Sequence, residues 1–195
     1  MSTCLGILSG DIAFDCTDLM LAGLEVDAVF VNHSDVDYVN STVSGTNDTI
    51  VTNLQLKAGK TGYLFPGVKQ INSLAFELVP KETTQDKFKH TFTGMMFNLS
   101  AANKLQLSKM VGGLFLVVVE LKWKGSSSED AFQVGGYNQG MRLTAVTWSS
   151  NENDGNVTLE FSSADGYEEP KPILTLLETD YATTSTAFKN KFLQP

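Results

Sequence analysis

The glycine-rich stretch FQVGGYNQGMRLTAVTWSSNENDGNVTLEFSS, residues 132–163, contains the spacing in this chain that comes nearest to a site for chemistry. Gly135 and Gly140 are separated as the outer glycines of a phosphate-binding loop are. Such a loop then needs a lysine and a serine or threonine to reach the phosphates and the magnesium ion, with a helix behind it. Met141 and Arg142 follow instead, and the next residues have a strand-like pattern. Nucleotide binding at this turn is therefore not expected.

The other ionisable residues form no familiar catalytic set. His33 and His90 are the only histidines in the chain, and neither has a cysteine or carboxylate at metal-ligand spacing on the same element. Asp35 and Asp37 lack the spacing and the closing glutamate of an EF-hand. The adjacent glutamates at 168–169 precede a proline in a polar turn, where we expect them to be solvated. We therefore predict no catalytic residue, no metal site and no cofactor, and we do not expect an enzyme.

The second half of the glycine-rich stretch predicts a β-hairpin. Asp154-Gly155 is a preferred two-residue turn, because both positions tolerate positive φ. Counting outward from that turn pairs Trp148 with Phe161, an aromatic cross-strand contact. Residues 137–140 are expected to form a separate tight turn. The predicted core residues of the hairpin are Val146, Trp148, Leu159 and Phe161.

Period-two alternation of apolar and polar residues predicts strands along most of the chain. The segment LFLVVVELKW, residues 114–123, is apolar on both faces at its start, as a central strand is. Strands are predicted at 25–33, 49–56, 72–79, 87–94, 114–123, 131–137, 141–148, 157–162 and 172–178.

One helix interrupts the strands at about 100–111, with Ser100 as its N-cap and two glycines, 112 and 113, after its end. A shorter helix is expected near 184–193. The predicted packed face of the first helix consists of Leu107, Met110 and Val111. The chain is therefore predicted to be one mainly β domain, residues 1–195: an antiparallel β-sandwich or barrel with one packed α-helix and long loops.

The segment SDVDYVNSTVSGTND, residues 34–48, is polar and has little apolar periodicity. A loop of this length in a compact domain is usually functional or disordered. We expect it to reach a neighbouring copy of the chain and to become ordered on assembly. The candidate self-assembly residues are Asp35, Asp37, Tyr38, Asn40, Thr46 and Asn47.

Composition excludes several classes of protein. The formal net charge is −8, and the basic residues are thirteen lysines and one arginine, Arg142. Because arginine forks are the usual readers of phosphates and base edges, a specific nucleic-acid binder is not expected. The chain has no apolar run long enough for a transmembrane helix, and its first twenty residues do not resemble a signal peptide. Cys4 and Cys16 are accordingly expected to be reduced.

Several segments, taken in order, resemble a family of virion structural proteins of tailed bacteriophages that infect Bacteroidota-type hosts. The resemblance begins with Cys4 and Cys16 and spans most of the chain. The segments that carry it are AGLEVDAVFVNHSDVD (22–37), GKTGYLFP (59–66), FTGMMFNLSAANKLQLSKM (92–110), LFLVVVELKWKG (114–125), FQVGGYNQGMRLT (132–144) and DGNVTLEFSSADGYEEP (154–170).

The resemblance implies a tail tube-like subunit, a β-sandwich whose copies assemble into stacked, typically hexameric, rings around a channel. DNA would pass through that channel without specific binding, and the protein would be located in the virion after assembly in the host cytoplasm. The other partners implied are further virion proteins, with no membrane and no cofactor. A head-decoration, tail-terminator or fibre-attachment module is the alternative. Tyrosines gathered on one exposed face, among Tyr38, Tyr63, Tyr137, Tyr167 and Tyr181, would favour that alternative.

Overall fold

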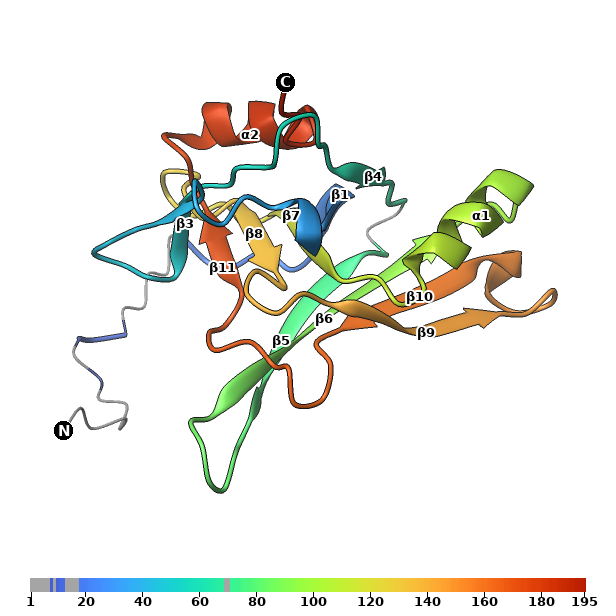
Figure 1. The fold of residues 1–195 in the computed structure, drawn as a ribbon, viewed down its shortest axis with the longest axis horizontal. Coiled ribbons are helices and arrows are strands. Elements are labelled where there is room, and N and C mark those ends of the chain that lie inside the picture. The colour runs from blue at the N-terminus through green and yellow to red at the C-terminus, as the bar shows by residue number, and fades with distance from the viewer. Residues whose placement is uncertain (1–7, 9, 13–17, 69–70) are drawn as a thin grey trace.

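The computed structural model describes residues 8, 10–12, 18–68 and 71–195, which form two β-sheets and two α-helices (Figure 1). The strands are β1 (Leu24–Asn32), β2 (Thr42–Val43), β3 (Ile50–Asn53), β4 (Tyr63–Phe65), β5 (Ser73–Val79), β6 (Lys87–Met96), β7 (Phe115–Leu121), β8 (Phe132–Gly135), β9 (Arg142–Trp148), β10 (Val157–Ser162) and β11 (Leu174–Leu176). The helices are α1 (Ala101–Met110) and α2 (Tyr181–Lys189), with 3-10 turns η1 (His33–Asp35) and η2 (Asn153–Gly155).

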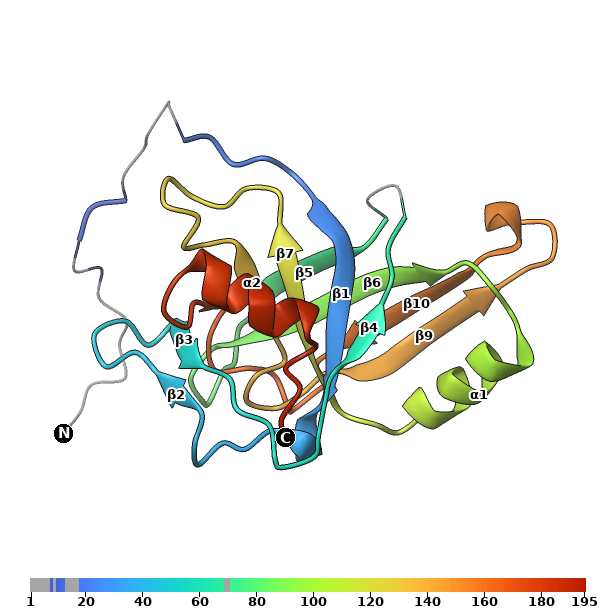
Figure 2. The same ribbon diagram turned by 90° about the horizontal axis from the view of Figure 1, so that it is seen from above.

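The two sheets pack as a β-sandwich and do not close into a barrel, so the predicted sandwich class is confirmed. The larger sheet has seven strands in the order β2-β3-β11-β8-β7-β1-β4, and the smaller has four in the order β5-β6-β10-β9. Neighbouring strands are antiparallel except β3 and β11, which are parallel. Helix α2 covers the outer face of the seven-stranded sheet, which makes three layers (Figures 1 and 2).

The seven-stranded sheet is buried on both faces, because its side chains supply two separate cores. Along β1, Ala28 and Phe30 point toward the four-stranded sheet, whereas Val29 and Val31 point toward α2. The first core is aromatic, and the ring centroid of Phe30 lies 4.8 Å from that of Phe161. This two-sided burial explains the continuous apolar run of β7.

All nine predicted strands are present, most of them shortened at the ends. β2 and β4 were not predicted, since strands of two and three residues leave almost no alternation to detect. β2 lies inside the segment 34–48 that was expected to be a loop. That segment also contains part of η1 and a bridge between Val36 and Leu56, so it is partly structured within a single copy.

Helix α1 begins as predicted, since the Ser100 side chain accepts a hydrogen bond from the backbone N–H of Asn103. The expectation that it is packed is only partly right, because no residue of α1 is fully buried. Leu107 and Met110 pack against the aromatic core, but Val111 is 70% exposed. The backbone turns extended at Val111, which therefore leaves the predicted face.

Helix α2 begins earlier than the predicted 184–193, because Asp180 caps it by accepting a 2.7 Å hydrogen bond from the N–H of Thr183. Phe188 lies in the helix and Phe192 beyond its end. Both are buried in the second core.

The β9–β10 hairpin exists, but its predicted register is wrong. Trp148 pairs with Val157, and Phe161 pairs with Leu143 across a β-bulge. The turn is a longer loop containing η2, in which Asp154 has φ 54° and Gly155 has φ 75°. The shift of four residues keeps the side chains on the same face, so Leu159 and Phe161 are core residues as predicted. The core prediction fails for Val146 and Trp148, which are 45% and 52% exposed.

Candidate functional site

The glycine turn at 135–140 does bind an anion, but the anion belongs to the chain itself. The backbone N–H groups of Asn138 and Gln139 donate hydrogen bonds to the Glu169 carboxylate at 3.0 and 2.8 Å. The Asn138 side-chain amide donates a third at 3.0 Å. Gly136 and Gly140 have φ values of 72° and 77°, which aim these donors inward. The turn is therefore a structural clamp occupied by Glu169.

His90 joins the same buried network. Its Nδ1 accepts a hydrogen bond from the Gly136 N–H at 3.1 Å, and its Nε2 lies 3.0 Å from the Lys171 carbonyl oxygen, to which it donates. Both ring nitrogens thus have partners only in the neutral tautomer with the proton on Nε2. Burial lowers the pKa of His90, and the nearby Glu169 carboxylate partly opposes that shift.

Glu168 points the other way, toward Lys81, whose Nζ lies 2.6 Å from its carboxylate. The hydrogen bond from Lys81 lowers the pKa of Glu168 to about 2. The expectation that the adjacent glutamates are solvated is therefore wrong. They are 4% and 1% exposed. Two successive side chains point to opposite sides of an extended segment. Here Lys81 lies on the side of Glu168, and the N–H donors of the turn lie on the side of Glu169.

The six residues predicted for self-assembly separate into two groups. Asp35 is buried, accepts a 2.8 Å hydrogen bond from the Asn32 side chain and lies 3.2 Å from Lys60 Nζ, so its role is structural. Asp37 caps the following turn through bonds from Val39 and Asn40. The exposed members are Tyr38, Asn40, Thr46 and Asn47.

Tyr38 is only partly available to a partner. Its hydroxyl donates to the Tyr137 carbonyl oxygen at 2.8 Å, and its ring lies 5.2 Å from that of His33. Burial raises the pKa of Tyr38 well above its ordinary value. Tyr137 is buried and Tyr181 stacks on Phe132, so the five tyrosines do not gather on one exposed face.

The four-stranded sheet offers a larger candidate for a contact surface. Its face toward the sandwich core is apolar across all four strands, but the seven-stranded sheet covers the edge strands only in part, at Leu74 of β5 and Leu143 of β9. The edge strands β5 and β9 are left with exposed apolar side chains on this face: Phe76, Leu78, Val146 and Trp148, each 45–55% exposed. Figure 1 shows this sheet projecting on both sides of the larger one. Alternation in the sequence identifies these side chains as part of an apolar strand face, but it does not show that the other sheet leaves them exposed.

The opposite face of the same sheet is mostly small and polar. One row across the four strands consists of Ser73, Thr93, Glu160 and Ala145. The next row contains Met95, Thr158 and Thr147. The charged residues of this face are Lys87, Lys89 and Arg142 together with Glu77 and Glu160, and 3.9 Å separates Lys89 Nζ from the Glu77 carboxylate. This face therefore presents hydroxyl groups with little net charge.

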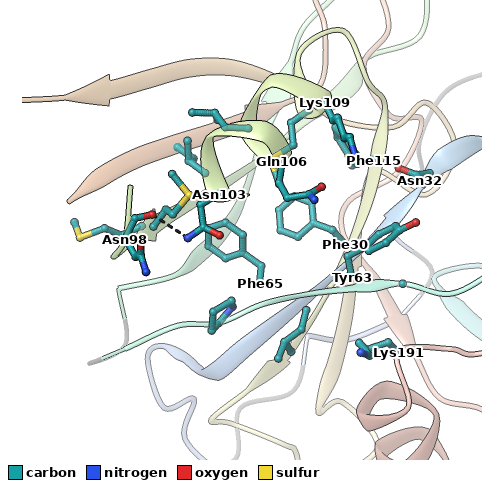
Figure 3. Close-up of a pocket in the computed structure, with 18 of the residues that line it drawn as sticks. Phe30, Asn32, Tyr63, Phe65, Asn98, Asn103, Gln106, Lys109, Phe115 and Lys191 are labelled. Atoms are coloured by element: carbon teal, nitrogen blue, oxygen red, sulfur yellow. Dashed lines mark hydrogen bonds between the residues drawn. The ribbon is translucent and has the colours of Figure 1, made fainter. Parts of the chain in front are cut away.

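A cavity of about 880 Å³ lies between α1 and the sheets (Figure 3). Its apolar wall includes Phe30, Phe65 and Phe115, and α1 contributes Leu107 and Met110. It remains open because α1 contacts the sandwich mainly through those two helix residues. Its charged lining residues are Lys109 and Lys191. Sequence reasoning did not find this cavity, although the run MMF at 95–97 at the end of β6 was an available signal.

No family model, curated protein or solved structure matches this chain. The resemblance to phage virion proteins consequently remains an expectation from the sequence. Among the described residues, no group of three or more histidine, cysteine, aspartate or glutamate side chains is arranged to hold a metal ion. No helix in that part of the chain is long and apolar enough to cross a membrane. Cys4 and Cys16 lie outside the described residues.

Proposed function

We propose that this chain is a self-assembling structural subunit of a phage particle, a tail tube-like protein whose copies join into rings. The observation that supports this best is the pair of uncovered edge strands, β5 and β9, with their exposed apolar side chains. Proteins that act as monomers usually protect such edges with lysine, proline or a covering element. Neither β5 nor β9 contains a lysine or a proline.

The strand directions are compatible with a closed ring. Each strand of the β5-β6-β10-β9 sheet is antiparallel to its neighbour. β9 of one copy would therefore run antiparallel to β5 of the next, and the hydrogen-bonded ladder would continue across the boundary. Because the two edges differ, the contact is head-to-tail, which is the type that closes rings.

In such a ring the hydroxyl-rich face of the four-stranded sheet would line the channel, because its other face is filled by the core. Six copies would place about 24 strands around the channel, more than the roughly 16–18 that already leave an aqueous pore in barrels. The net charge of −8, with thirteen lysines and a single arginine, limits the phosphate contacts that would hold passing DNA. The proposed DNA contact is thus passage without specific binding.

The alternative is a head-decoration, tail-terminator or fibre-attachment module, which would not form open tubes alone. Negative-stain electron microscopy of the purified protein separates the two. Rings or tubes with an open lumen support the proposal, together with a large, concentration-dependent mass in light scattering. Dispersed single particles with a monomer mass, even in concentrated protein, would contradict it.

A further inference from the structure

The N-terminal arm, defined here as residues 1–21, carries apolar side chains outside both cores at the positions that the structure describes. Neither core cluster contains any of its described residues, 8, 10–12 and 18–21. Asp18 anchors its base by accepting a 2.9 Å hydrogen bond from Trp123 Nε1. The exposed apolar side chains among its described residues are Leu8, Ile12, Leu19, Met20 and Leu21, at 59–86% exposure. Apolar side chains grouped in this way indicate a segment that is buried against a partner.

The middle of the arm also has the pattern of a strand. In DIAFDCT, residues 11–17, Ile12, Phe14 and Cys16 alternate with more polar residues that include Asp11 and Asp15. Such a segment can bury one apolar face while its other face stays in water. It is seven residues long, comparable to an ordinary strand.

The cavity beneath α1 adjoins a strand edge with which such a segment can pair. It adjoins β4, whose one edge pairs with β1 and whose other edge has no partner strand among the described residues. Tyr63 and Leu64 of β4 are 56% and 51% exposed. A peptide strand added to such an edge gains main-chain hydrogen bonds, while alternate side chains enter the adjoining apolar pocket.

Charge favours the same pairing. The cavity lining contains Lys109 and Lys191 and no aspartate or glutamate. The arm contains Asp11, Asp15 and Asp18 and no lysine or arginine. Opposite charges at the rim of an apolar contact steer the partner and set its register more than they add affinity.

In both Figure 1 and Figure 2 residues 10–12 of the arm lie at the side of the molecule opposite α1. A second copy is therefore the occupant that the placement favours.

We propose that the N-terminal arm of one copy docks in the cavity beneath α1 of another copy. Residues 11–17 add as a strand to the free edge of β4, and Ile12, Phe14 and Cys16 face the apolar wall. This inference rests on the proposed self-assembly and adds a second contact to the β5–β9 edge. The partner of the cavity is then the acidic, apolar segment 11–17 of another copy of this chain.

Disulfide trapping in the full-length protein tests this arrangement, because the arm carries its own cysteines. Gln106 of α1 lines the cavity (Figure 3), whereas its neighbour Leu105 does not. We expect Gln106→Cys, under a mild copper oxidant, to give covalent dimers and higher species on a non-reducing gel. Peptide mapping should find Cys16 joined to position 106. Leu105→Cys, 55% exposed on the same helix, is the matched control and should yield several-fold less.

Charge reversal gives a second readout. Combining Lys109→Glu with Gln106→Cys should lower the yield about two- to fivefold, the range expected for one exposed ion pair. Equal yields at positions 105 and 106 would overturn the proposal, as would the absence of covalent dimers. A disulfide confined within one chain would show that the arm covers its own cavity, and would equally overturn it.

The two proposed contacts can be refuted independently of each other. If the β5–β9 contact is wrong, tubes do not form while Cys16 still joins position 106 of another copy. If the arm contact is wrong, tubes form normally and the disulfide between copies is missing.

Discussion

The carboxylate of Glu169 accepts a hydrogen bond from the backbone N–H of Asn138 at 3.0 Å and fills the anion-binding turn that lies 31 residues before it in the chain. Gln139 adds a second backbone donor. This relationship ties the loop after β10 to the turn between β8 and β9, and it therefore joins the two sheets. The contribution of these hydrogen bonds, and of the residues around them, to the free energy of unfolding can be measured.

Replacing Glu169 with glutamine should lower the free energy of unfolding by about 1–3 kcal/mol. The substitution keeps the shape but turns one acceptor oxygen into an N–H donor that faces existing donors. Urea denaturation followed by tryptophan fluorescence measures the loss. Glu152→Gln, at an exposed position, is the matched control and should change stability by less than about 0.5 kcal/mol. Equal effects of the two substitutions would contradict a structural role for the Glu169 clamp.

The turn glycines should not tolerate alanine equally. At Gly136, with φ 72°, an added Cβ would lie 2.8 Å from the Phe115 carbonyl oxygen. At Gly155, with φ 75°, it would meet nothing within 4 Å. We expect Gly155→Ala to cost about 1–2 kcal/mol from backbone strain alone, and Gly136→Ala to cost clearly more. Thermal and urea unfolding of both variants test this order, and a reversed order would refute it.

Stability should fall as the pH decreases below about 6.5, because of His90. Burial lowers the pKa of His90 in the folded state below its value of 6.5 in the unfolded chain. Protons therefore bind the unfolded state more readily, so the stabilisation is complete above pH 6.5 and declines as the pH falls toward the lowered value. Urea midpoints between pH 8 and pH 5.5 measure the slope. His90→Gln should flatten it, and an unchanged slope in that variant would contradict the role of His90.

Blocking a strand edge should abolish assembly without unfolding the subunit. Val146→Lys places a charge on β9, where the side chain is already 45% exposed, so the folded monomer should tolerate it. Rings and tubes should disappear from electron micrographs while the urea midpoint stays near that of the wild type. Leu105→Lys, on α1, is the control and should still assemble. Normal tubes from Val146→Lys would remove β9 from the contact.

Deleting residues 38–46 should leave a folded chain that no longer polymerises. No member of either core cluster lies within this range, although the deletion removes β2 and the bond from Tyr38 to Tyr137. Circular dichroism and size-exclusion chromatography check the fold, and electron microscopy checks assembly. Tubes of normal appearance would show that the segment makes no essential contact with a neighbour.

Much of the fold follows from local pattern. Alternation placed nine strands, and Ser100 marked the start of α1, because side-chain period and capping depend on residues close in sequence. The candidate sites were predicted less well from local pattern. Local pattern predicts that the glutamates at 168–169 are solvated, because no neighbouring residue in the sequence indicates Lys81 or the turn at 138–139 as a partner. Those partners come from the β5–β6 connection and the β8–β9 turn, far away in the sequence.

The amino-acid order alone therefore determined the mainly β class, the anionic composition and the apolar identity of Val146 and Trp148, whereas the choice of a sandwich over a barrel came from the structure. Which apolar side chains are covered depended on how far one sheet overlaps the other, and so on packing between distant strands. The same is true of the Glu169 clamp and the cavity beneath α1. Each is a contact between segments far apart in the chain, for which local propensity carries no information.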